Sequence, residues 1–460
     1  MIPTSDRITA ALAERIVKTR YDDFSDAAIR GAKVIILDAL GVMLAASREP
    51  IGHVLAEFIE AEAGPAQCTV VGLGVKTSAF WAAFGNGTLS RALEYDPLSP
   101  GHHPCGANLP PCLALTEKHR LIGRRFLEAF IVGVELQHRL HQAAAARALH
   151  SSSMGSGRGV LGTLPAAATA AKLIGLPQEL TQQALAIAAS RTGGIDSTGT
   201  MCNPGDSGNA ASTGVFAATL AAKGFTGRTN LFGGPYGFKQ FLGEDAPVES
   251  IVENFGKPWG LEQPGIELKL YSCQGHAHRT IEAILSLFKE RPWKPQDIES
   301  IDVASETLPT VAPYNYYTAK NDNPASPIDA RFSLRYIAAV TALEGKLDVD
   351  SFADGKRLSA PVVEMVEKVR VQLLPEKGHK VRVILRFRDG TSRHLEVARA
   401  KSLATADAPE KFLNCARRII TEQAAYSVIE MVETLEQRTE LGLLFKFIQG
   451  NRPAKPTLGR

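Results

Sequence analysis

One stretch of the chain gathers side chains that can move protons. From residue 94 to residue 111 the sequence reads EYDPLSPGHHPCGANLPP, which places Glu94 and Asp96 shortly before His102 and His103. Histidine titrates close to neutral pH, and a neighbouring carboxylate can orient its ring or stabilise its charge. Because proline interrupts regular elements, we expect a loop over Glu94–Pro111 that forms one wall of a cavity.

A second polar stretch lies between alanine-rich segments. Small side chains let helix backbones approach closely, so these segments are expected to cross at the centre of a helical domain. The insert at residues 194–209, which contains Asn203 and Asp206, would then form another cavity wall. The helices that flank it are predicted over residues 165–177, 180–191 and 210–223.

The remaining chain divides into a helical part, a mixed part and a helical tail. Apolar periodicity predicts helices up to about residue 260, whereas short alternating runs begin near Glu299. Within these runs Asp389-Gly390 is a strong hairpin turn. The predicted fold is mainly α with an α+β part: a large all-helical domain built from both chain ends, with a smaller α+β lid domain inserted. The predicted limits are 1–264 for the first helical part, 265–402 for the lid and 403–460 for the returning helices.

Composition excludes several classes of protein. The 460 residues are 45% hydrophobic and 22% charged, with a net charge of +3 and no long basic run, so nucleic-acid binding is not indicated. Six cysteines without a CxxC pair argue against a zinc ribbon or an iron–sulfur cluster and favour free thiols in a reducing cytoplasm. The charged N-terminus does not look like a signal peptide, and no apolar run approaches the roughly 18 to 20 residues that span a bilayer.

Several segments, taken in order, resemble the MmgE/PrpD family. The resemblance implies the two-part fold described above, a homodimer, a substrate cleft between the parts and no metal or organic cofactor. Family members include 2-methylcitrate dehydratase, cis-aconitate decarboxylase and iminodisuccinate epimerase, so the resemblance also implies a small carboxylic acid as substrate. The segments are residues 37–47, 94–104, 133–139, 166–177, 208–227, 269–283 and 330–339.

The resemblance implies roles for residues in the polar stretch 94–111 and in the predicted lid. His103, followed by proline, matches a family acid/base, and Glu94 and Asp96 match an acidic pair that orients it or caps a turn. His278 matches a lid histidine, although His276 could take that role because the spacing from Cys273 is one residue longer than usual.

Two further lid positions match more loosely. Tyr317 falls where the family often supplies a tyrosine that reaches the cleft, but Tyr314 and Tyr316 are its neighbours. Lys269 and Tyr271 match the strand that leads to the lid site, where they either bind substrate or only end the strand.

The chain departs from the family pattern at three positions, Ser156, Asn203 and Asp206. The family usually has a histidine where Ser156 stands, and Lys-Pro-x-His where this chain has Asn203-Pro204-Gly205-Asp206. A cation that would bind a substrate carboxylate is therefore replaced by an amide. Arg158 or Arg191 could supply that cation, because an arginine fork suits a carboxylate.

Two local patterns have ordinary explanations. The segment from Gly157 to Gly162 fits GxGxxG, but no strand precedes it, so close helix packing is the better interpretation than dinucleotide binding. Glu135, His138 and His141 share one helix side like metal ligands, yet their alanine-rich surroundings favour core or interface histidines.

The favoured hypothesis is a cofactor-independent lyase that acts on a small di- or tricarboxylic acid by proton abstraction α to a carboxylate. His103 and His278 would exchange protons with the substrate, and Asn203, Arg158 and Tyr317 would position it. The two alternatives are an isomerase or epimerase on the same scaffold and a non-catalytic ligand-binding protein.

Overall fold

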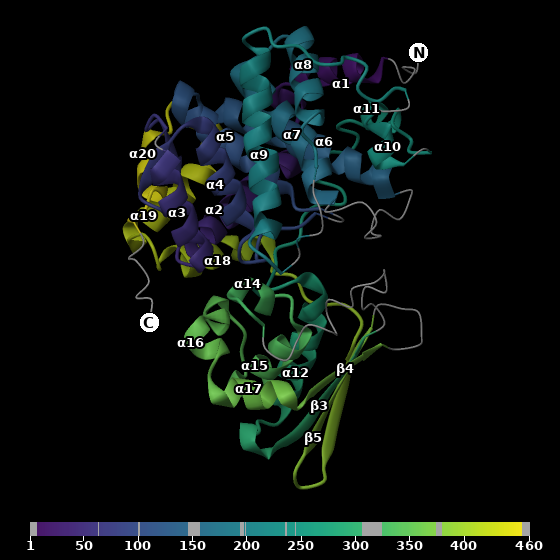
Figure 1. Ribbon diagram of the computed structural model, residues 1–460, viewed down its shortest axis with the longest axis vertical. Helices are drawn as coiled ribbons and strands as arrows, with labels where there is room; N and C mark the ends of the chain where they lie inside the picture. The colour runs from purple at the N-terminus through teal and green to yellow at the C-terminus, as the bar shows by residue number, and fades with distance from the viewer. Residues whose placement is uncertain are drawn as a thin grey trace.

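The protein consists of two lobes stacked along its long axis, one of helices and one of a sheet with helices (Figure 1). The structure is a computed structural model that describes residues 7–62, 64–99, 102–145, 157–193, 197, 199–234, 237–243, 245–305, 324–373 and 380–452. The helical lobe contains α1 (Ile8–Lys18), α2 (Asp26–Ala46), α3 (Pro50–Glu62), β1 (Cys68–Val70), β2 (Val75–Thr77), α4 (Ala79–Arg91), α5 (Pro104–His119), α6 (Gly123–Ala145), α7 (Gly157–Ile174), α8 (Gln178–Ala189), α9 (Cys202–Ala221), α10 (Lys239–Leu242), α11 (Ser250–Glu253), α18 (Ala408–Ala416), α19 (Glu422–Glu433) and α20 (Gly442–Ile448).

The centre of the helical lobe is formed by helices that cross at very short distances. On α4, a Cβ atom added to Gly87 would lie 2.8 Å from the Cα atom of Gly208 on α9. On the other side of α9, a Cβ added to Gly214 would lie 2.4 Å from the backbone of Ala166 on α7. Only residues without a side chain allow this approach. The predicted close crossing of the small-residue helices is confirmed.

Two predicted loops are wrong in part, because helices begin inside them. α5 starts at Pro104 and continues through Pro110 and Pro111, and α9 starts at Cys202, with Pro204 in its first turn. Proline is tolerated in the first turn, where the N–H group has no partner within the helix. In α5 the interior prolines cost hydrogen bonds, but nearly the whole helix is buried, so tertiary packing outweighs local preference.

The smaller lobe is a four-stranded sheet covered by helices. The strand order is β4-β3-β5-β6, with β3 and β4 parallel and the other pairs antiparallel. Gly390, with a φ of 82°, forms the turn of the β5–β6 hairpin, as predicted. The elements are α12 (His278–Glu290), β3 (Ile298–Ser305), α14 (Pro327–Ala330), α15 (Leu334–Glu344), α16 (Asp354–Arg357), α17 (Ala360–Glu367), β4 (Val369–Leu373), β5 (Val381–Phe387) and β6 (Ser392–Val397).

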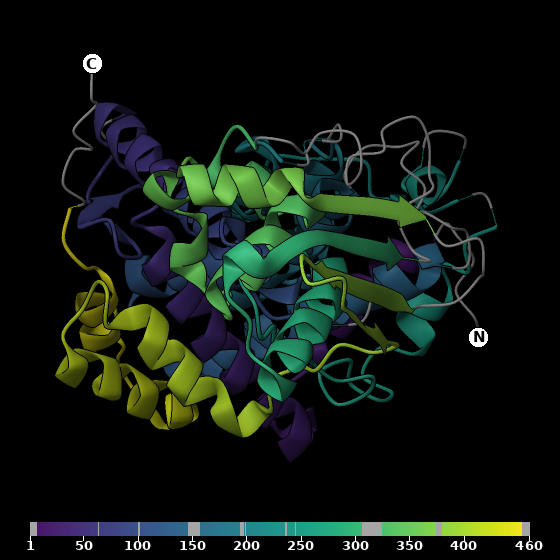
Figure 2. The ribbon, with the colours of Figure 1, turned by 90° about the horizontal axis from the view of Figure 1, so that it is seen from below.

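Segments from both ends of the chain build the helical lobe. The yellow C-terminal helices lie beside the purple α2 and α3, whereas α1 lies on the other side of the lobe (Figure 1 and Figure 2). One buried apolar cluster combines residues of α1–α9 with residues of α18–α20, and a second combines α12, α15, α17 and the sheet. The predicted class, mainly α with an inserted α+β part, is confirmed. The domain limits at residues 264 and 402 stay predictions.

Candidate active site

A fully buried arginine binds the polar side chains of residues 94–103. Arg91 ends α4, and only 1% of its surface is exposed. One terminal nitrogen, Nη2, donates to Glu94 Oε1 at 2.6 Å, and the other, Nη1, donates to Asp96 Oδ1. Glu94 has a positive φ of 48°, rare for a side chain of its size. The chain turns at Glu94, so that the carboxylate of this residue contacts the guanidinium of Arg91, three residues earlier.

His103 contacts both Arg91 and Asp96. It is the residue before α5, and its Nδ1 lies 2.9 Å from Asp96 Oδ2 and 2.7 Å from Arg91 Nη1. Burial and the nearby Arg91 charge lower the pKa of His103 to about 4, although Asp96 acts in the opposite direction. Burial alone would raise the pKa of Asp96, but Arg91 and His103 hold it far below its ordinary range. At neutral pH the site therefore contains a neutral imidazole beside an ionised carboxylate.

Lys269 connects this loop to the smaller lobe. Its buried ammonium donates to the backbone oxygen of Glu94 at 2.7 Å, to Glu94 Oε2 at 3.3 Å and to the backbone oxygen of Cys273 at 3.3 Å. Ser272 adds a hydrogen bond to the backbone oxygen of Leu93 at 2.9 Å. These contacts join segments about 175 residues apart. Lys269 therefore ties the two candidate segments together, in addition to any contact with substrate.

His278 is the first residue of α12 and only 5% exposed. Its ring meets the edge of Tyr271, with centroids 5.3 Å apart, and backbone groups of Cys273 and Tyr271 favour its charged form and so raise its pKa. Nε2 has no hydrogen-bond partner among the described residues. Burial, and then the charge of Lys269, lower the pKa of His278 to about 3. Because Lys269 acts electrostatically on both imidazoles, His103 and His278 both lie near one buried cation.

Comparison with known proteins identifies the family. Residues 10–251 match the MmgE/PrpD N-terminal domain and residues 271–437 match the MmgE/PrpD C-terminal domain.

The chain belongs to the MmgE/PrpD family.

Relatives are similar over nearly their whole length. Cis-aconitate decarboxylase of Homo sapiens is 28% identical over 473 residues, which cover 97% of this chain and 95% of the relative. Cis-aconitate decarboxylase of Aspergillus terreus is 26% identical, with 98% and 97% covered. A cis-aconitate decarboxylase-like protein, oryM, of Aspergillus oryzae is also 26% identical. Decarboxylases are lyases, so these relatives support lyase chemistry at the level of the family.

Within this MmgE/PrpD fold, the start of α9 lies against α5 and Arg91. A Cβ atom added to Gly106 on α5 would lie 2.9 Å from Ser207 Oγ on α9 and 3.2 Å from Arg91 Cγ. Asn203, which is 2% exposed, and Asp206, whose carboxylate accepts a hydrogen bond from Ser197 at 3.0 Å, lie in the first two turns of α9. The structure therefore brings the start of α9 beside Arg91.

The other predicted residues have different surroundings. His102 is buried, stacked on His141 at 4.9 Å and next to His138 at 5.8 Å. His276 is exposed, which makes His278 the better lid candidate. Arg158 lies in α7, but its side chain is outside the part that the structure describes, and Tyr317 and Ser156 are outside it altogether.

Arg91 and Lys411 were not singled out from the sequence. Lys411, on α18, contacts Asp38 Oδ1 and the backbone oxygen of Tyr95, both at 2.8 Å, and lies 3.8 Å from the centre of the Tyr95 ring. A sequence signal for Arg91 was available. Arg91 is a charged residue in a helix of otherwise mostly small or apolar residues, and acidic residues follow it three and five positions later. For Lys411 and Asp38, more than 370 residues apart in the sequence, no local signal exists.

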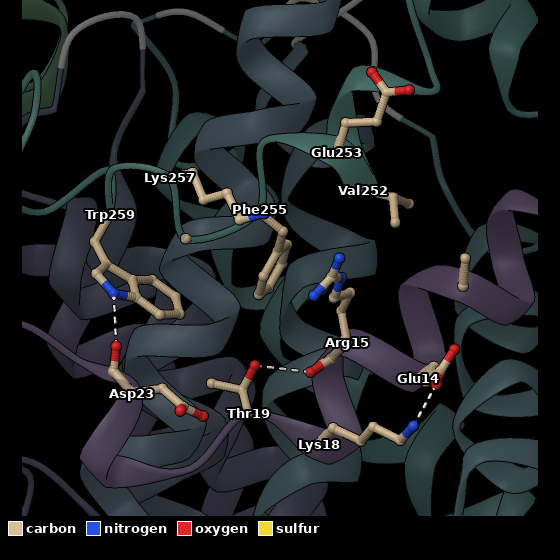
Figure 3. A pocket seen from close by; sticks show the side chains of 12 residues that line it. Glu14, Arg15, Lys18, Thr19, Asp23, Val252, Glu253, Phe255, Lys257 and Trp259 are labelled. Carbon is tan, nitrogen blue, oxygen red and sulfur yellow. Dashed lines mark hydrogen bonds and ion pairs between the residues drawn. The ribbon is translucent and has the colours of Figure 1, made fainter. Parts of the chain in front are cut away.

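A surface pocket of about 730 Å³ lies elsewhere, between α1 and residues 252–259 (Figure 3). Phe255 and Trp259 form one side, and Arg15 extends from α1 toward Phe255. The Trp259 ring nitrogen donates to the backbone oxygen of Asp23 at 3.2 Å. No predicted site residue lines this pocket, so it is separate from the candidate active site.

Two negative findings apply to the described residues only. Across the ranges given above, no group of three or more His, Cys, Asp or Glu side chains has a geometry that could hold a metal ion, and this includes Glu135, His138 and His141. Among the helices of those same ranges, none combines the length and the apolar composition that a bilayer-spanning helix requires.

Proposed function

We propose that this MmgE/PrpD protein is a cofactor-independent lyase that acts on a small hydroxylated or unsaturated di- or tricarboxylic acid. The observation that carries the proposal is that His103 and His278 lie on segments of different lobes that the buried ammonium of Lys269 joins through hydrogen bonds to Glu94 and Cys273. Decarboxylation is the favoured reaction, since the relatives named above are decarboxylases.

The chemistry of such a lyase fits these groups. Loss of carbon dioxide leaves the electron pair of the broken C–C bond on a carbon next to a carboxylate, and that carbon must then receive a proton. Loss of water begins instead with removal of a proton from such a carbon. Both need a proton-exchanging group and a hydrogen-bond donor for the charge that spreads onto the carboxylate. In the dehydration, one neutral imidazole can accept the proton from carbon. In the decarboxylation, the imidazole must first take a proton from solvent and then deliver it to the carbon, while the N–H group of the other ring hydrogen-bonds the carboxylate.

Recognition of the substrate carboxylates is assigned to the start of α9 and to neighbouring segments. Asn203 and Arg158, with Tyr317 from the lid, are proposed to position the substrate. His102, His276 and Asp206 are proposed as further residues that bind the substrate. The change from Lys-Pro-x-His to Asn203-Pro204-Gly205-Asp206 argues for a substrate that differs from the citrate-like acids of the family. A homodimeric assembly and a cytoplasmic location also stay predictions.

The test is incubation of the full-length protein with a panel of these acids in deuterated water, followed by proton NMR. Release of carbon dioxide or water with deuterium in the product supports the lyase. Deuterium uptake without loss of either group supports the epimerase instead. If no acid reacts but one raises the melting temperature, the chain is a binding protein and the lyase proposal is wrong.

Variants connect the activity to the two histidines. His103→Gln and His278→Gln are each expected to lower the rate by about 10²- to 10⁴-fold, the usual contribution of a positioned acid or base. His394→Gln is the matched control, because His394 lies exposed on β6. Full activity in either site variant would contradict the proposed roles.

A further inference from the structure

Three consecutive backbone oxygens before Asp96 accept hydrogen bonds from side chains that are distant in the sequence. These oxygens lie beyond the end of α4, where a helix no longer supplies donors. The donors belong to the segment that leads into the smaller lobe and to α18, in the C-terminal part of the chain. The bonds are Ser272 Oγ to Leu93 at 2.9 Å, Lys269 Nζ to Glu94 at 2.7 Å and Lys411 Nζ to Tyr95 at 2.8 Å.

The loop needs such support because of its backbone at Glu94. The φ angle there is 48°, in the left-handed region that residues with a side chain seldom adopt. A residue stays in this region only where the surrounding contacts hold it. The turn at Glu94 leads directly to Asp96, whose Oδ2 lies 2.9 Å from His103 Nδ1. A change in this turn would therefore move Asp96 relative to the candidate acid/base.

Lys411 contacts the residue between Glu94 and Asp96 in two ways. Its ammonium binds the backbone oxygen of Tyr95 and lies 3.8 Å from the centre of the Tyr95 ring, a cation–π contact. Asp38, a buried residue of α2, lies 2.8 Å from the same ammonium and balances its charge. Lys411 is itself only 5% exposed. The ammonium is therefore fixed between α2 and the loop.

Two roles fit these contacts, and they differ in what depends on the ammonium. If Lys411 only neutralises Asp38, removal of both charges would leave the loop as it is. If the bond to Tyr95 is needed as well, removal of both charges would release the loop. The second role accounts for more of the geometry, because two buried ammoniums, Lys269 and Lys411, bind adjacent oxygens of the same turn.

We propose that Lys411 is a positioning residue of the candidate active site. By binding the backbone oxygen of Tyr95, it holds the turn at Glu94 and thereby keeps Asp96 in contact with His103. This role is the same whether His103 accepts a proton from the substrate or delivers one. The effect on catalysis rests on the proposed function, whereas the effect on the loop is a property of the protein without substrate.

The test is a double variant of the full-length protein, Asp38→Leu with Lys411→Met. Apolar replacement of a whole buried ion pair is often neutral for stability, so this variant is expected to fold. Its crystal structure is compared with one of the wild-type protein, both without ligand. The expected result is a Glu94 φ angle outside the left-handed region and an Asp96–His103 contact lengthened by about 1 Å or more. A loop that keeps the positive φ and the 2.9 Å contact overturns the inference.

Rates separate a positioning role from an effect on stability. With the acid of the panel above that reacts, the double variant should lose about 10²-fold in kcat, the cost of a misplacement by about 1 Å, with KM little changed. Lys411→Arg keeps a donor for Tyr95 and should retain most of the rate. Lys172→Met is the matched control, because Lys172 is also a buried lysine that binds backbone oxygens, those of Val17 and Thr19. An equal loss of rate in the control would contradict the proposed role.

The remaining outcomes also decide the question. If the double variant does not fold, Lys411→Gln is the second measurement, because its neutral side chain is one bond shorter and should not reach both Asp38 and Tyr95. The same displacement of Asp96 is expected. A displaced loop with full activity would show that Lys411 does not position the reacting groups. If no acid of the panel reacts, the lyase proposal fails, and the crystal structures alone decide whether Lys411 holds the loop.

Discussion

The two candidate histidines owe their low pKa mainly to burial, but they differ in the groups that surround them. His103 is surrounded by charged side chains that pair with one another, so ionic hydrogen bonds fix its ring. His278 is surrounded by an aromatic ring and backbone groups, so packing and burial fix it. Both pKa values fall well below the ordinary value of 6.5, to about 4 and about 3. The comparison teaches that burial keeps an imidazole neutral both beside the Arg91–Asp96 ion pair and near the ammonium of Lys269.

The largest loss of stability is expected from substitution of Arg91, at the centre of the charged residues around His103. Arg91→Met leaves Asp96 and Glu94 buried with less neutralisation, and removal of one partner from a buried ion pair costs about 3 to 5 kcal/mol. Urea denaturation of the variant should show this loss in the free energy of unfolding. Arg124→Met is the control, because Arg124 and Asp22 form an exposed pair that contributes no more than about 1 kcal/mol. Equal effects of the two substitutions would contradict the role given to the buried pair.

The second prediction compares the histidines directly by replacing each with phenylalanine. His103→Phe removes hydrogen bonds to two charged groups and should cost about 1.5 to 3 kcal/mol. His278→Phe keeps the ring contact with Tyr271, and the backbone oxygens of Tyr271 and Cys273 retain other donors, so the cost should stay below about 1.5 kcal/mol. The measurement is again urea denaturation. A larger loss at residue 278 than at residue 103 would reverse the comparison.

The lid side contains one polar contact that can be removed alone. The Tyr271 hydroxyl donates to Glu282 Oε1 at 2.9 Å, and both residues are buried. Tyr271→Phe should lower the free energy of unfolding by about 1.5 kcal/mol, the low end for a hydrogen bond to a charged group, and should keep the edge contact with His278. The ¹⁵N NMR signals of the His278 ring check that the ring has not moved, because they should be unchanged.

The last prediction concerns the pH dependence of stability. The pKa of His103 is lowered in the folded state, so its stabilising contribution is complete above about pH 6.5 and is lost as the pH falls toward about 4. In that window the unfolded chain binds one more proton at this site than the folded chain does. His103→Phe should therefore reduce the slope of stability against pH by at most about 1.4 kcal/mol per pH unit. An identical slope for wild type and variant would show that His103 is not the titrating group.

Local sequence patterns determined most of the elements and pointed to several site residues. Apolar periodicity identified the helices of the first lobe, and Asp389-Gly390 identified the hairpin. Both were predictable because each signal is contained in a few consecutive residues. The same local signal was misleading at Pro104 and Cys202. Prolines and polar residues there suggested loops, whereas burial against neighbouring helices stabilises α5 and the start of α9.

The sequence by itself determined the fold class and the residue types of the candidate site, since side-chain spacing along one element is a local property. Only the tertiary structure decided how those residues are used. Arg91 meets Glu94, Asp96 and His103 through a chain reversal, and Lys269 reaches Glu94 across about 175 residues. Such ion pairs are strong only where water is excluded, and burial is a result of the whole fold, not of any single segment.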